Sequence, residues 1–74
     1  MPPPFELYER VEILTDRFES EGVPAGTVGY VIERYDDGAL EVEVSNSTTG
    51  ETIALVVATE AELVNAPLEG GHRP

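Results

Sequence analysis

Hydrophobic and polar residues alternate most clearly in the middle of the chain, where residues 26–44 predict a β-hairpin. Glu41 and Glu43 alternate with aliphatic residues, the two-residue period of a strand with one buried and one solvated face. The run over residues 28–32 is rich in β-branched and aromatic side chains, which favour a strand. Asp36-Asp37-Gly38 lies between the two runs, and Asp before Gly in that position is typical of a hairpin turn.

Segments before this hairpin predict a first strand and a long loop. Residues 8–14 place Val11 and Ile13 on one face, which favours a strand, with a helix over residues 5–14 as the alternative. A polar loop follows over residues 15–25. Gly26 and Gly29 then bracket the entry to the hairpin, and glycine in a strand marks a bulge or a close backbone approach.

Segments after the hairpin predict a second hairpin and a short end strand. A polar turn at residues 46–50 precedes an apolar run at residues 52–57, in which Ile53, Leu55 and Val57 share one face. Thr59 and Glu62 have the spacing of a capping box, which predicts one helical turn. Residues 63–64 then return as a brief last strand.

This order of elements predicts an all-β protein, a small SH3-like barrel of about five antiparallel strands with one helical turn before the last strand. We assign residues 1–7 to a disordered Pro-rich arm, residues 8–64 to the barrel and residues 65–74 to a disordered Gly/Pro tail. A plain twisted sheet that dimerises face to face is the alternative.

Charge limits the classes of partner. The 74 residues carry 15 Asp and Glu against four Lys and Arg, a formal net charge of −11, which repels phosphate backbones and anionic lipid head groups. We therefore expect no nucleic-acid and no membrane partner. The chain has no cysteine and no apolar run near the ~20 residues of a membrane span, so we expect a cytoplasmic protein.

The residues that usually carry catalysis are scarce. His72 is the only histidine and lies in the Gly/Pro tail, and without cysteine the serines have no evident activator. Carboxylate pairs such as Glu41 and Glu43 need a pocket that separates their pKa values, and a chain of this size offers little pocket. We predict that the protein is not an enzyme and that it has no metal site and no cofactor.

Two classes of function remain. The first is an antitoxin or immunity-like module whose acidic hairpin face covers a basic protein partner, such as a toxin. Its predicted partner-binding residues are Glu33, Asp36, Asp37, Glu41 and Glu43, with Phe18, Tyr30 and Tyr35 as apolar anchors. For Phe18 the alternative is that it folds back to cap the core. The second class is a structural or assembly module, a homodimer or an accessory to a larger enzyme, that uses an exposed sheet edge. Affinity that falls steeply with salt favours the first class.

Four sequence blocks carry a resemblance to a known family. They cover residues 10–16, 22–31, 38–44 and 52–57, and the second contains Gly26-Thr27-Val28-Gly29. Over residues 8–64 the chain resembles a bacterial family of small acidic proteins defined only as a domain of unknown function. That family is similar to the SH3-like parts of nitrile hydratase β subunits and their accessory proteins, and some members are encoded beside toxin-like genes. The resemblance implies a binding or neutralising module without known active residues.

Overall fold

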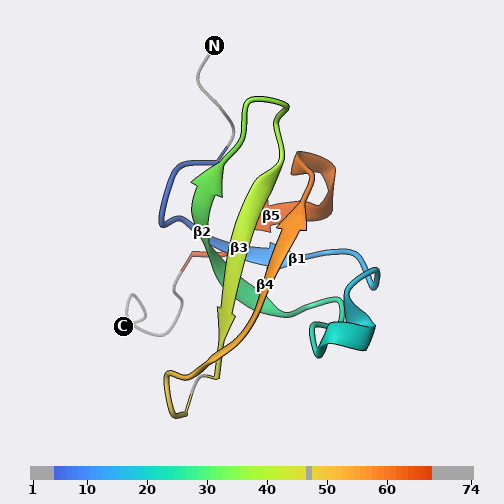
Figure 1. Ribbon diagram of the computed structural model, residues 1–74, viewed down its shortest axis with the longest axis vertical. Helices are drawn as coiled ribbons and strands as arrows, with labels where there is room; N and C mark the ends of the chain where they lie inside the picture. Colours follow the sequence, from blue (N-terminus) through green and yellow to red (C-terminus); the bar gives the residue numbers. More distant parts are fainter. Residues whose placement is uncertain (1–4, 47, 68–74) are drawn as a thin grey trace, which may run out of the picture.

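The computed structural model describes residues 5–46 and 48–67, which form one antiparallel sheet in the order β4-β3-β2-β1-β5. Its strands are β1 (Arg10–Ile13), β2 (Val28–Arg34), β3 (Leu40–Ser45), β4 (Thr52–Ala58) and β5 (Leu63–Asn65). The 3₁₀ turn η1 (Glu19–Glu21) lies in the long loop after β1, and η2 (Glu60–Glu62) precedes β5 (Figure 1). The predicted all-β fold of five antiparallel strands with a helical turn before the last is confirmed, and η1 is an addition to it.

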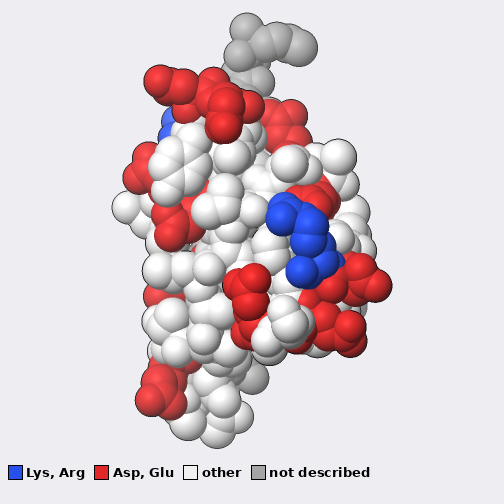
Figure 2. All heavy atoms as spheres, turned by 45° about the vertical axis from the view of Figure 1, so that its right-hand side comes forward, with Lys and Arg blue, Asp and Glu red and all other residues white. Residues whose placement is uncertain are grey.

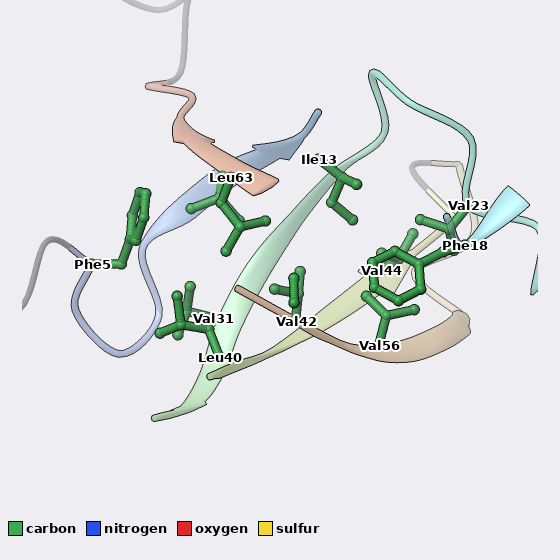
Figure 3. Packing of buried hydrophobic residues seen from close by; sticks show 12 residues of the cluster. Phe5, Ile13, Phe18, Val23, Val31, Leu40, Val42, Val44, Val56 and Leu63 are labelled. Carbon is green, nitrogen blue, oxygen red and sulfur yellow. The ribbon is translucent and has the colours of Figure 1, made fainter. Parts of the chain in front are cut away.

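The sheet coils so that its two ends face each other. In Figure 1, β1 and β5 pass behind β3 and β4 at a steep angle. The inward side chains of both parts, such as Ile13 on β1 and Val42 on β3, are fully buried and meet in one core (Figure 3). Burial of the inner face of every strand leaves the opposite face of β2, β3 and β4 toward solvent, and we call this surface the outer face.

Two phenylalanines close opposite ends of this core. Phe18, from the loop before η1, lies at the end near Val23, and Phe5 lies at the other end (Figure 3). Phe5 is only 7% exposed, so the folded unit begins before residue 8, where the sequence placed its boundary. The rest of the predicted arm, residues 1–4, and residues 68–74 of the predicted tail lie outside the described residues.

The first strand is shorter than predicted because the chain turns before it. Tyr8 has a left-handed backbone with φ of 69°, and the Glu9 amide donates to the Glu6 carbonyl at 3.2 Å. A left-handed residue interrupts an extended strand. β1 therefore begins at Arg10.

The central turn follows its sequence chemistry. The Tyr35 amide donates to the Ala39 carbonyl at 2.9 Å, and the Gly38 amide donates to the Tyr35 carbonyl at 3.0 Å. Gly38 has φ of 92°, and the Asp37 carboxylate accepts the Ala39 amide at 3.0 Å. A three-residue loop with glycine in the left-handed region is a common hairpin connection, so the predicted turn at Asp36-Asp37-Gly38 is confirmed.

The sequence placed Ile53, Leu55 and Val57 on one face of β4, and Leu55 and Val57 do share a face, but it is the outer one. A register shift between Val44 and Ser45 interrupts the alternation at Ile53. Val42 on β3 is buried and pairs with Val56, so the register directs Val56 and Ala58 into the core and their neighbours outward. Ile53, Leu55 and Val57 are 49%, 52% and 47% exposed. We call Leu55 and Val57 the aliphatic strip.

An ion pair ties the long loop to η2. Arg17 Nε donates to Glu62 Oε2 at 2.8 Å, and Arg17 Nη2 donates to Glu62 Oε1 at 2.7 Å. The Thr59 amide donates to Glu62 Oε1 at 2.9 Å, completing the predicted capping box. These hydrogen bonds, those from Arg17 first, lower the pKa of Glu62 from 4.5 to about 2.

This lowered pKa predicts a specific loss of stability in acid. A carboxyl whose pKa is lower in the folded state stabilises the fold above its unfolded pKa, and that contribution disappears as pH falls toward the folded value. Because both side chains are partly exposed, we expect about 1 kcal/mol. The free energy of unfolding in urea should therefore differ between the natural protein and Glu62→Gln at about pH 6, and the difference should shrink at about pH 3.

Glu51→Gln, at an exposed turn residue, is the control and should keep the same difference from the natural protein at both pH values. A Glu62→Gln difference that is independent of pH would contradict the role given to the Arg17 pair.

Candidate functional site

The outer face gathers most of the predicted partner-binding residues. On β3, Glu41 and Glu43 are half-buried, and on β2, Glu33 is exposed. Glu33 lies directly opposite Glu41 across the strand pair, after a bulge between Val31 and Glu33, and Tyr30 lies opposite Glu43. We call Glu33, Glu41 and Glu43 the carboxylate row. Like charges directly opposite on neighbouring strands destabilise a sheet, so the fold holds these carboxylates together at a cost.

The arginines of the described residues do not neutralise the carboxylate row. Arg10 Nη1 donates to the Ala66 carbonyl at 2.8 Å, and Arg34 Nη1 donates to the Phe5 carbonyl at 3.5 Å. Arg17 is paired with Glu62. Figure 2 shows Asp and Glu side chains on both sides of this view, with one group of Lys or Arg atoms between them. Among residues 5–46 and 48–67, the negative charge of the row is therefore not balanced by an ion pair.

Hydroxyl groups hold two of these carboxylates in place. The Tyr35 hydroxyl donates to Glu41 Oε1 at 2.7 Å, and the Thr52 hydroxyl donates to Glu43 Oε2 at 2.8 Å. The hydrogen bond to Glu41, with desolvation and the nearby negative charges, raises the pKa of Tyr35, so the phenol stays a donor. Tyr30 and Tyr35 are each 43% exposed. The predicted aromatic anchors Tyr30 and Tyr35 thus lie beside the row.

The two aspartates of the turn lie at one end of the hairpin. Asp36 and Asp37 are both exposed. Beside them, between the turn and η2, are two adjoining clefts of about 270 and 370 Å³ that share Gly38, Ala39 and Glu60. Such volumes are near the lower limit of the ~300–1,000 Å³ of small-molecule sites. The clefts suit one inserted side chain better than a metabolite.

Phe18 is not part of this surface. It is 5% exposed and belongs to the core, and the Arg17 guanidinium covers its ring at 4.3 Å from the centroid. The prediction of Phe18 as an exposed partner contact is therefore wrong. Its alternative, that Phe18 folds back to cap the core, is confirmed. The physical reason is that the coiled sheet is open at this end and a large apolar side chain is needed to exclude water from it.

The sequence interpretation missed the aliphatic strip as a surface feature. Leu55 lies opposite Glu43 and Val57 lies opposite Glu41, so the strip runs directly alongside the carboxylate row. Figure 2 shows an uncharged band along this side of the molecule. The signal in the sequence was the small size of Ala54 and Ala58, because small residues suit the inner face where the sheet packs closely.

Two other kinds of site are absent from the described residues. Within residues 5–46 and 48–67, no group of three His, Cys, Asp or Glu is placed to hold a metal ion. In the same part of the chain, no helix has the length and apolarity to cross a membrane. The outer face remains the surface where the predicted residues come together.

Comparisons with known proteins give one match. A family model described as "Domain of unknown function (DUF4926)" matches residues 7–65. Neither the curated proteins nor the solved structures contain a match to the chain. The matched region spans β1 to β5 and includes every residue of the outer face.

Proposed function

The chain belongs to the DUF4926 family of domains of unknown function, and we propose that it is a non-catalytic cytoplasmic module that binds a basic protein partner on its outer face. The observation that carries this proposal is the carboxylate row. Glu33 and Glu41 are held opposite each other without an arginine partner in the described residues. A partner that supplies Lys or Arg would relieve this repulsion and be steered toward the face.

The finer form of the proposal is an antitoxin or immunity-like protein that neutralises a basic toxin. Hydroxyl groups already fix the carboxylates of Glu41 and Glu43, so less side-chain freedom is lost on binding. Asp36, Asp37 and the clefts beside them would receive a further basic side chain at the hairpin end. The strand order and the helical turn before β5 support an SH3-like relationship, which we include in the proposal.

The alternative, an assembly module or homodimer, is favoured less by the surface. At a net charge of −11, two copies repel each other, and packing outer face on outer face would bring two carboxylate rows together. Self-association that tolerates salt would nevertheless favour this alternative.

The first test is an affinity purification of partners from the native cytosol, followed by titration of the purified partner. Glu41→Lys with Glu43→Lys should weaken its affinity by about 100-fold, because two favourable charge contacts become repulsive. Raising the salt concentration from about 0.1 to about 1 M, which shortens the screening length from about 10 to about 3 Å, should weaken binding to the natural protein as well.

The matched control is Glu6→Lys with Glu19→Lys, which changes net charge equally at two exposed residues that lie outside the outer face. It should retain affinity within about threefold. Equal loss in both double variants would show that only net charge matters, and a salt-indifferent dimer without any basic partner would overturn the proposal.

A further inference from the structure

The aliphatic strip is an apolar feature that an acidic binding surface alone does not explain. Leu55 and Val57 occupy outward positions of one strand and are each about half exposed. They border the carboxylate row through the pairs Leu55 with Glu43 and Val57 with Glu41. Single exposed apolar residues are ordinary, whereas a contiguous group edged by polar residues marks an interaction surface.

The long loop after β1 contacts the free edge of β4 at two points, which hinders a partner strand from extending the sheet there. Arg17 Nη2 donates to the Val57 carbonyl at 3.3 Å. Farther along the same loop, Gly22 lies against Ile53, since a Cβ on Gly22 would be 3.8 Å from Ile53 Cγ2. The loop thus contacts β4 near both of its ends, a common protection of sheet edges. We therefore place the partner on the outer face.

A segment that lies on a sheet face has to satisfy its own backbone hydrogen bonds. The strands beneath it already use theirs for pairing, and buried amide and carbonyl groups without partners are costly. An α-helix meets this requirement within a single segment. From Leu55 to Val57 the strip is about 7 Å long at about 3.3 Å per residue, which corresponds to a little more than one helical turn at about 1.5 Å per residue.

The charge around the strip decides which charged residues that helix must carry. One flank of the strip is the carboxylate row, and the protein carries a net charge of −11. A helix with an apolar stripe on Leu55 and Val57 would place its flanking residues over Glu41 and Glu43. Lys or Arg there would bury their aliphatic stems on the strip and extend their charged ends to the carboxylates. A second copy of this acidic chain would bring mainly negative charge to this surface and would not neutralise the carboxylates.

We propose that the outer face docks a basic amphipathic α-helix of the partner protein, with its apolar stripe on the aliphatic strip and its Lys or Arg side chains on the carboxylate row. This inference rests on the proposed function and specifies the class of segment that is bound. It differs from attraction by charge alone in one respect: the order of apolar and basic residues in the partner decides affinity.

The test uses a blocked synthetic peptide of about 16 residues, long enough to form a helix on binding, with leucines at positions i, i+4, i+7 and i+11 among lysines. Two control peptides have the same composition in scrambled order, or a central proline that interrupts the helix. Binding is followed by amide chemical shifts of the protein. The ordered peptide should shift β3 and β4 resonances and bind at least about tenfold more tightly than either control.

A matched pair of protein variants locates the contact. The double variant Leu55→Thr with Val57→Thr should bind the ordered peptide with an affinity lower by about tenfold or more. The control variant Leu14→Thr with Val64→Thr changes the same residue types away from the outer face, at similar exposures of 51% and 42%. Its affinity for the ordered peptide should stay within about twofold of that of the natural protein. Circular dichroism and thermal melting establish that each variant is folded.

The outcomes separate this inference from the proposed function. If all three peptides bind alike, or if shifts appear only around Asp36 and Asp37, helix docking is overturned while binding of a basic partner stands. Failure of the ordered peptide to bind also overturns helix docking. If the native partner is indifferent to Glu41→Lys with Glu43→Lys, the proposed function itself fails.

Discussion

Replacing Gly29 by alanine is expected to destabilise the protein by about 3 kcal/mol or more, a large share of the roughly 5 kcal/mol typical of a small domain. A Cβ at this position would lie 2.6 Å from the Glu43 carbonyl oxygen and 2.8 Å from Val42 Cγ1. The first of these atoms is the backbone of β3, which is paired on both sides. It cannot move without disturbing the centre of the sheet.

Thermal melting and urea unfolding would measure this effect, with an expected fall in Tm of more than about 12 °C. Gly26→Ala is the control. Gly26 has φ of 95°, and no atom lies within 4 Å of the place that its Cβ would take, so only backbone strain of about 1 kcal/mol should appear. β-propensity alone would rank the two changes in the opposite order, because alanine suits a strand better than glycine does. A Gly29→Ala variant that is only slightly less stable than the natural protein would contradict the close approach of β2 to β3.

The second large effect is expected for Phe18→Ala, at about 3 to 5 kcal/mol. Phe18 is 5% exposed and closes one end of the core, so its removal opens a cavity and exposes neighbouring valines. The cation–π contact with Arg17 is lost as well. Urea unfolding monitored by circular dichroism would measure the loss.

Phe18→Leu, which keeps most of the volume, should cost less than about 1.5 kcal/mol and should bind the basic partner as the natural protein does. Tyr35→Ala, at a 43% exposed residue, should cost less than about 1 kcal/mol of stability. A fully folded Phe18→Leu variant that no longer binds the partner would show that Phe18 contacts it after all.

The candidate site was predictable where its residues are neighbours in the chain or across the central hairpin. Glu41 and Glu43 follow from alternation, and their closeness to Glu33 and Tyr30 follows from a hairpin whose turn is fixed by Asp37 and Gly38. Two features were not predictable in this way. The exposure of Leu55 depends on the register of β4, and the burial of Phe18 depends on how a long loop folds back.

The sequence by itself determined the elements that local chemistry controls. These elements are the turn at Asp36-Asp37-Gly38, the capping box of Thr59 and Glu62 and the strands between them. They depend on contacts within a few residues, so the sequence pattern predicts them directly. The net charge of −11 likewise needs no fold.

Tertiary structure decided which surfaces those elements present. β4 is apolar on both faces, so its alternation does not say which face is buried. Pairing of Val42 with Val56 settles this and leaves Leu55 and Val57 outside beside the carboxylates. In the same way, coiling of the sheet opens the end of the core that Phe18 fills and brings β3 against Gly29. These outcomes depend on contacts between residues far apart in the chain, which periodicity does not encode.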